Sequence, residues 1–168
     1  AAIYGLLARL FYAPPDRDLL AQLLHAGYFD AASGEPAAVA WRELVEAASS
    51  AFPVVLENEH TELFVGTGKA EVTPYLGHYV ARYATDNPLV DLRAQLARWG
   101  MARHESAPEP EDHVAGVCEA MRLAIAVQQR SLEEQRSFFH GFLYQGTRAF
   151  CDAVLASPKA NFYGRVAR

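Results

Sequence analysis

The stretch VAGVCEAMRLAIAVQ, residues 114–128, shows the clearest helical periodicity in the sequence. The side chains of one face recur every three or four residues, at Val114, Val117, Cys118, Met121, Ala124, Ile125 and Gln128. This spacing matches the turn of an α-helix, so it gathers the apolar side chains into one stripe. The stretch therefore predicts a long helix that buries one face against neighbouring helices.

The same periodicity extends toward both ends of the chain. Apolar stripes with helical spacing occur in five further segments, residues 3–11, 19–24, 41–48, 89–99 and 139–155. Asp16 and Pro88 stand where two of these segments begin, and Pro53 is placed to open a further helix through Phe64. No run of alternating β-branched residues predicts a strand. We therefore expect an all-α, single-domain bundle of roughly eight to ten helices over residues 1–168.

Four further positions carry expectations about this bundle. Asn161 is expected to cap a short terminal helix. Gly146 lies on the apolar face of the last long helix, where it permits a close helix approach or marks a kink. Residues 65–76 break the pattern with a glycine-rich turn and a proline. Residues 102–112 are polar and form the longest candidate loop, a possible hinge between two helical halves.

The composition argues against several classes of protein. A net charge of −5 at pH 7 argues against nucleic-acid binding, which relies on a basic surface. No run of about 18 consecutive apolar residues is present, so no membrane span is expected. The first residues enter a helical pattern directly, so no signal peptide is expected. Two cysteines without a CxxC motif are typical of reduced, mostly buried thiols in a cytoplasmic protein.

The charge is unevenly distributed along the chain. Residues 53–120 carry a net charge of −6, whereas the remaining residues together carry +1. An acidic middle section favours a basic partner. A solvated acidic surface explains the same count equally well.

Metal and phosphate-binding motifs are incomplete. A di-iron site in a helical bundle needs a carboxylate-x-x-His pair on each of two helices, and the sequence has one such pair, Glu57 with His60. The turn at Gly66–Lys69 lacks the spacing of a phosphate-binding loop. We therefore expect neither a metal nor a bound cofactor.

Asp112 and His113 have two interpretations. They are a candidate acid–base couple for a small enzyme, although neighbouring residues on a helix point about 100° apart. Alternatively, Asp112 caps the following helix, whose dipole favours Glu109 and Glu111 nearby. Their place at a polar helix start predicts low burial for both side chains.

Large apolar side chains flank the glycine-rich turn, at Leu63, Phe64, Pro74, Tyr75 and Tyr79. The acidic segment Glu109–His113 opens the later long helix. Apolar groups near acidic ones suit a groove for a peptide that has an apolar stretch and arginines. Alternatively, these large side chains belong to the hydrophobic core, since such residues are usually buried.

These segments, in this order and spacing, resemble the TorD/DmsD family of redox-enzyme maturation chaperones, which is related to the NarJ type. The resemblance rests on HTELFVG at residues 60–66, PYLGHY at 74–79, EPEDHVAGVCEAM at 109–121 and ANFY at 160–163. Each motif is weak alone, but their order and spacing together are fairly specific, and the resemblance covers nearly the whole chain from Tyr4–Phe11 onward. Leu76 and Gly77 depart from the family pattern, which often has Glu and Ser there. Phe142 and Gly146 stand where His and Trp are common, and these departures concern the client protein more than the fold.

The resemblance implies an all-helical cytoplasmic chaperone without catalytic activity. Such a protein binds the twin-arginine leader and the apo form of a molybdopterin-dependent oxidoreductase subunit, and holds it for cofactor insertion before export or assembly. By motif matching, the leader-binding residues would be Leu63, Phe64, Pro74, Tyr75, Tyr79, Glu111, Asp112 and His113. Weak guanine nucleotide binding, and a monomer or a domain-swapped dimer, follow from the resemblance only.

The sequence does not choose the client among dimethyl sulfoxide, trimethylamine oxide, nitrate and formate enzymes. Two other classes stay open beside the chaperone. One is a helical regulatory or scaffold module whose acidic face binds another basic partner. The other is a small enzyme that uses Asp112 and His113, and it would require a third catalytic partner and a defined pocket.

Overall fold

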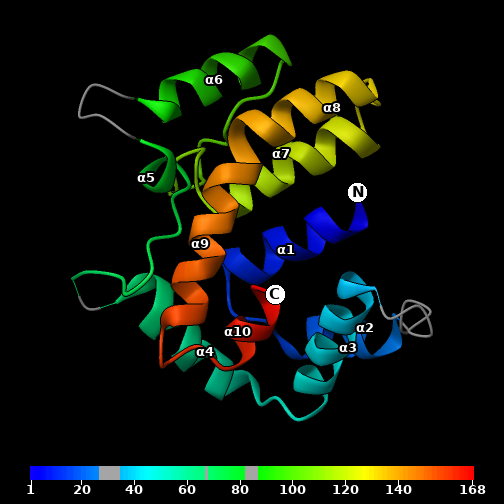
Figure 1. The fold of residues 1–168 in the computed structure, drawn as a ribbon, viewed down its shortest axis with the longest axis vertical. Helices are drawn as coiled ribbons and strands as arrows, with labels where there is room; N and C mark the ends of the chain where they lie inside the picture. Colours follow the sequence, from blue (N-terminus) through cyan, green and yellow to red (C-terminus); the bar gives the residue numbers. More distant parts are fainter. Residues whose placement is uncertain (27–34, 67, 82–86) are drawn as a thin grey trace. The chain divides into compact units, whose positions relative to one another are not determined.

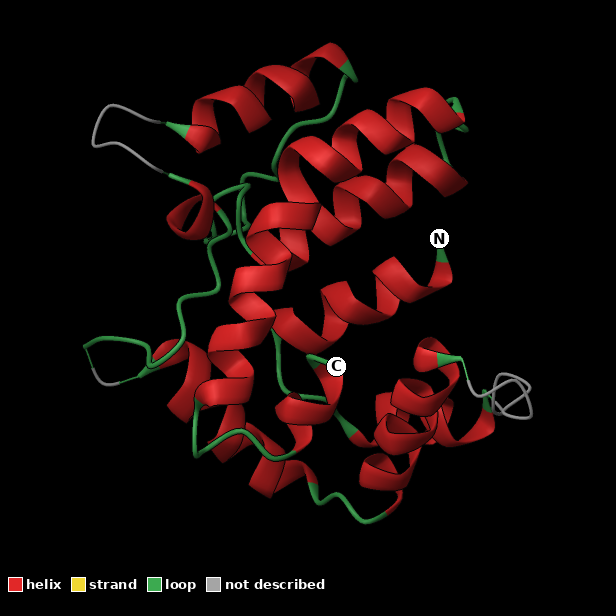
Figure 2. Cartoon of the chain, in the orientation of Figure 1, coloured by secondary structure: helices red, strands yellow, loops and turns green. Residues whose placement is uncertain are grey.

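The computed structural model describes residues 1–168 except 27–34, 67 and 82–86. Helices dominate this described part of the chain, which contains no β-strand (Figures 1 and 2). The one β-type pairing found there is an isolated antiparallel bridge between Tyr75 and His113. The predicted all-α class is confirmed. None of the described helices is both long enough and apolar enough to cross a membrane.

The chain divides into two compact units. The first unit comprises Ala1–Tyr12 and Thr73–Phe150, and the second comprises Ala13–Val72 and Cys151–Arg168. Residues 102–112 lie inside the first unit and contain no unit boundary. The single domain and the hinge at 102–112 stay predictions.

The first unit is built around α1 and α7, which pack against each other (Figure 1). Its helices are α1 (Ala2–Tyr12), α5 (Gly77–Val80), α6 (Pro88–Arg98), α7 (Val114–Ala126) and α8 (Leu132–Phe138). A π-helix, η3 (Phe139–Tyr144), leads from α8 into α9 (Gln145–Ala156), which continues into the second unit. The stripe that defines residues 114–128 supplies core side chains such as Val114, Val117 and Ala124.

Gly146 brings the start of α9 close to the segment before α5. A Cβ atom added at Gly146 would lie 3.1 Å from the Cβ of Leu76 and 3.2 Å from its carbonyl oxygen. These distances are tighter than ordinary van der Waals contact, so a larger residue would push the two segments apart. The close-approach interpretation of this glycine is confirmed.

The second unit contains α2 (Arg17–His25), α3 (Pro36–Ser49), α4 (Pro53–His60), the π-helix η2 (Thr61–Val65) and α10 (Phe162–Val166). Asp16 caps α2 as predicted, since its Oδ1 accepts the backbone N–H of Leu19 at 2.7 Å. Pro53 opens α4 from its first turn, and Pro88 opens α6 in the same way. All three residues therefore mark helix starts, as predicted from the sequence.

The cap of α10 differs from the prediction. Asn161 occupies the N-cap position but makes no side-chain cap hydrogen bond. Instead, the carboxylate of Glu59 on α4 accepts the backbone N–H groups of Asn161, Phe162 and Tyr163 at 2.8, 3.2 and 2.8 Å. A buried carboxylate from a distant segment thus satisfies the donors that open this helix.

Candidate functional site

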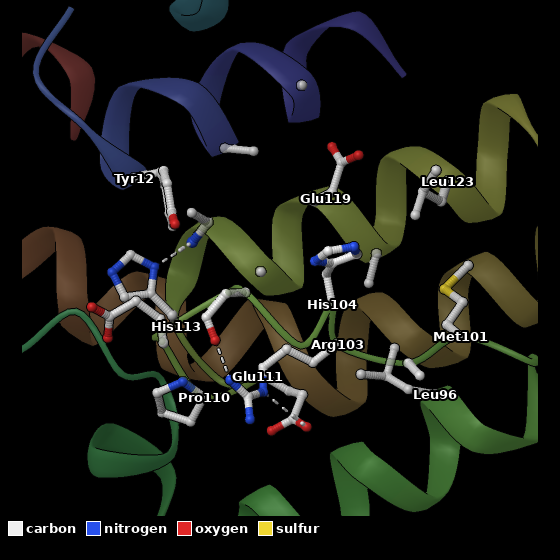
Figure 3. A pocket seen from close by; sticks show the side chains of 18 of the residues that line it. Tyr12, Leu96, Met101, Arg103, His104, Pro110, Glu111, His113, Glu119 and Leu123 are labelled. Atoms are coloured by element: carbon white, nitrogen blue, oxygen red, sulfur yellow. Dashed lines mark hydrogen bonds and ion pairs between the residues drawn. The ribbon is translucent and has the colours of Figure 1, made fainter.

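A cavity of about 400 Å³ lies within the first unit, bordered by α1, α7, the end of α6 and the segment 101–113 (Figure 3). We call it the α1–α7 cavity. Its walls are formed by small residues on both helices, Gly5 and Ala8 on α1 and Gly116 and Ala120 on α7. A Cβ atom added at Gly5 would lie 2.9 Å from the side chain of Arg122, and one added at Gly116 would lie 3.0 Å from the carbonyl oxygen of Glu111, so the two glycines allow these neighbours to approach closely.

The α1–α7 cavity combines an apolar interior with charged groups. Tyr12, Leu96, Met101 and Leu123 contribute larger apolar surfaces, as Figure 3 shows. The charged and titratable side chains among the lining residues are Arg9, Arg103, His104, Glu109, Glu111, His113 and Glu119. A cavity of this size with a few convergent polar groups is typical of a ligand-binding site.

The structure brings two of the predicted motif segments together beside the cavity. The backbone N–H of Val114 donates to the carbonyl of Pro74 at 2.8 Å, and that of Leu76 donates to the carbonyl of Asp112 at 2.9 Å. These bonds flank the bridge between Tyr75 and His113. The segment 109–114 is therefore held in a fixed position by the segment 74–76.

His113 is buried and caps α7. Its side chain is only 6% exposed, and Nδ1 accepts the backbone N–H of Ala115 at 3.2 Å. The rings of Tyr75 and Tyr12 meet the imidazole edge to face, with centroids 5.6 and 6.3 Å away. The expectation of low burial for this residue is wrong, and so is the expectation that Asp112 caps the helix.

Asp112 points to the start of α5 instead. A Cβ atom added at Gly77 would lie 2.7 Å from Oδ2 of Asp112, so the glycine leaves room for this carboxylate. Burial raises the pKa of Asp112, and the facing backbone N–H of Gly77 acts in the opposite direction. Asp112 thus contacts Gly77 at the start of α5, whereas His113 bonds to the backbone of Ala115 in α7.

Tyr75 and Tyr79 are partly buried and hydrogen-bonded. The hydroxyl of Tyr75 donates to Glu109, and this bond together with burial raises the pKa of Tyr75 to about 12. The hydroxyl of Tyr79 donates to the carbonyl of Thr73 at 2.9 Å. Pro74 is buried, so it supports the segment rather than offering surface.

Glu111 forms ion pairs with two arginines that the sequence analysis did not connect to it. Arg93 on α6 approaches Oε2 at 2.9 Å, and Arg103 lies 3.9 Å from Oε1. Burial raises the pKa of Glu111, but its own backbone N–H, Arg93 and Arg103 together outweigh that effect and hold the pKa below its usual range. Glu111 is therefore ionised at neutral pH.

Leu63 and Phe64 lie in the second unit. Leu63 is fully buried, and Phe64 packs edge to face on Tyr163 with a centroid distance of 5.0 Å. Neither side chain offers surface to a peptide in this arrangement. Their predicted part in leader binding stays a prediction.

The α1 side of the cavity and its basic residues were not predicted from the sequence. Gly5, Ala8 and Tyr12 recur at helical spacing, and so do Gly116 and Ala120 on α7. Small residues at helical spacing in two segments were the sequence feature that could have indicated the cavity. Arg93 and Arg103 carried no signal of their own, because Arg93 is an exposed residue of an amphipathic helix and Arg103 lies in the polar segment 102–112.

The other candidate chemistry of the sequence is not assembled in the described residues. No group of three or more His, Cys, Asp or Glu side chains there is placed to hold a metal ion. Cys118 and Cys151 are not joined by a disulfide bond. Burial raises the pKa of Cys151 to about 11, and Asp152 adds to that effect.

Comparison with known proteins gives concordant results. Residues 30–152 match the family model of the nitrate reductase delta subunit. The chaperone protein TorD of Photobacterium profundum is 29% identical over 112 residues, which cover 60% of this chain and 52% of TorD. The chain thus spans about half the length of this curated relative.

A solved structure extends the comparison to the fold. The crystal structure of an Archaeoglobus fulgidus protein assigned to redox enzyme maturation aligns with 98% of this chain and 87% of its own, with a TM-score of 0.58. Sequence identity is 19%, so this similarity concerns the fold alone.

Proposed function

Because the chain belongs to the nitrate reductase delta subunit family, which confirms the resemblance drawn from its motifs, we propose that it is a maturation chaperone for a redox enzyme. Its client is the apo form of a molybdopterin-dependent oxidoreductase subunit. The chaperone binds the twin-arginine leader of that subunit in the cytoplasm and holds the subunit until its cofactor is inserted. The name of the TorD relative supports the same role.

The observation that carries this proposal is the α1–α7 cavity. Its apolar interior suits the hydrophobic part of a leader peptide, and its volume of about 400 Å³ accommodates several apolar side chains. Glu109, Glu111 and Glu119 line the same cavity and suit a basic peptide segment. One unit of the chain thus presents both surfaces that such a leader requires.

Within this site the predicted residues have distinct tasks. Tyr75 and Pro74 hold the acidic segment in place through the backbone pairing and the bond from Tyr75 to Glu109. His113 fixes the start of α7. Glu111 is the residue of the predicted set that both lines the cavity and carries a charge. We assign arginine recognition to it rather than to the half-buried Asp112.

The test is a calorimetric titration with twin-arginine leader peptides from the molybdoenzymes of the source organism. Each leader is paired with a version that carries two lysines in place of the arginines. We expect micromolar or tighter binding to one leader, weakened by the lysines because ammonium groups lack the forked geometry of guanidinium. No binding to any leader would refute leader recognition and favour the mature client or another basic partner.

A further inference from the structure

Glu111 already binds guanidinium groups that belong to this chain. Both Nε and Nη2 of Arg93 lie 2.9 Å from Oε2, and Nε of Arg103 lies 3.9 Å from Oε1. Each carboxylate oxygen thus faces one arginine. The Glu111 side chain is 15% exposed, whereas Arg93 and Arg103 are 51% and 38% exposed. The carboxylate is largely covered, and its two partners are more exposed than it is.

We propose that Glu111 is the guanidinium subsite of the α1–α7 cavity, and that Arg93 and Arg103 occupy it until the arginine pair of a bound peptide displaces them. This inference rests on the proposed leader binding and specifies which carboxylate recognises the arginines and what competes for it. The internal arginines set the affinity of the site and favour release of the peptide.

Two neighbouring carboxylates, those of Glu109 and Asp112, are less suited to this exchange. Glu109 accepts the hydroxyl of Tyr75, and Asp112 lies half-buried against Gly77. Displacing either partner would leave a partly buried group without its hydrogen bond, which is unfavourable. Exchange at Glu111 replaces one arginine by another of the same charge and geometry.

The exchange is energetically close to balanced. Arginine side chains that are a third to a half exposed are rehydrated when they leave, and ion pairs of such residues contribute little to stability. Arg93 and Arg103 still lower the fraction of molecules in which Glu111 is open to the peptide. The apparent affinity for the peptide falls in proportion to that open fraction. Removing the internal arginines should therefore strengthen peptide binding.

The experiment compares leader affinity in the full chain carrying Arg93→Gln, Arg103→Gln or both, with Glu111→Gln as the loss variant. Arg98→Gln is the matched control for each single variant, because it removes one positive charge from α6 and Arg98 donates to Gln95 outside the cavity. We expect the double variant to bind about fivefold more tightly, Glu111→Gln about tenfold more weakly, and Arg98→Gln as the wild type does. Thermal unfolding of each variant separates a binding effect from loss of fold.

The outcomes distinguish this inference from the proposed function. If the leader binds the wild type but Arg93→Gln and Arg103→Gln, which each lose one positive charge, gain nothing over Arg98→Gln, the inference is overturned and leader binding stands. If no leader binds any variant, leader binding fails, and the blocked dipeptide Ac-Arg-Arg-NH2 tests the subsite by NMR titration. Dipeptide binding that is stronger in the double variant and lost in Glu111→Gln would support the subsite, and equal shifts in all variants would refute it. Should the double variant not fold, Arg93→Gln alone supplies the comparison, since Arg93 makes the closer contact with Glu111 and lies on the same helix as the control Arg98.

Discussion

Glu59 shows how much one buried side chain contributes to the second unit. Its carboxylate accepts three backbone N–H groups at the start of α10 and is itself only 9% exposed. Such charge-assisted bonds are stronger than neutral ones, and their loss leaves backbone donors buried. Glu59 therefore ties α4 to α10 through chemistry that the local sequence around Asn161 does not reveal.

We predict that Glu59→Gln lowers the free energy of unfolding by roughly 1–3 kcal/mol, because an amide offers one acceptor oxygen in place of two charged ones. Urea denaturation followed by circular dichroism measures the change. Glu57→Gln is the control, since it removes the same charge from an exposed position of the same helix. Equal losses in the two variants would mean that charge, and not the cap, is responsible.

Asp112 provides a pH-dependent prediction. Burial raises its pKa in the folded protein, so ionising this group costs stability, and the cost appears as the pH rises above the unfolded pKa toward the folded one. We predict that Asp112→Asn is more stable than the wild type at pH 7, and that the difference shrinks as the pH falls to the range where Asp112 is protonated. Parallel urea titrations of both proteins at pH 7 and about pH 4, near the ordinary pKa of an aspartate, measure it. A variant that is less stable at pH 7 would show that the carboxylate's bond to Gly77 dominates over its burial.

At the scale of whole elements, the sequence predicts the helices far better than their contacts. The stripes of α1 and α7 and the prolines of α4 and α6 are local signals, and the structure has these helices as expected. The π-helices η2 and η3 were not predicted, because a wider turn is chosen by packing against other segments and not by local pattern.

In the candidate site, too, local motifs were predictable from the sequence and contacts between distant segments were not. The motifs at 74–79 and 109–113 were recognisable in the sequence, and the structure pairs them. The sequence did not reveal that α1 lines the cavity or that Arg93 and Arg103 pair with Glu111. These features bring together segments that are distant in the sequence. The expected burial and capping at 112–113 were wrong for a related reason, since Asp112 is drawn to α5 and leaves the cap to His113.

The small-residue wall of the α1–α7 cavity can be tested by filling it. Ala120 on α7 lines the cavity, whereas Ala126, the last residue of the same helix, is exposed and outside it. We predict that Ala120→Leu weakens leader binding by roughly tenfold, because the added carbons occupy space that the peptide needs. Ala126→Leu should leave binding unchanged. The measurement is calorimetric titration, with helicity checked by circular dichroism, and equal affinity in both variants would place the leader elsewhere.

For the whole molecule, the distribution of charge connects the sequence to the proposed function. The net charge of −6 between residues 53 and 120 includes Glu109, Glu111 and Glu119, all of which line the cavity. The charge within this section can attract a basic peptide over distances comparable to the Debye length, which is about 10 Å at 0.1 M salt. The two arginines of the leader add a contribution to its affinity that depends on geometry as well as charge.

We therefore predict two separable effects on leader affinity. Raising the salt concentration from about 50 to 500 mM should weaken both the arginine leader and its lysine version by roughly three- to tenfold, because both carry the same charge and are screened alike. The lysine version should remain roughly fivefold weaker at either salt concentration, because its ammonium groups cannot reproduce the two-point contact with Glu111. Isothermal titration at both salt concentrations checks each effect. A salt dependence without an arginine preference would leave only a general attraction to the acidic section, and an arginine preference that disappears at high salt would rule out a defined guanidinium contact.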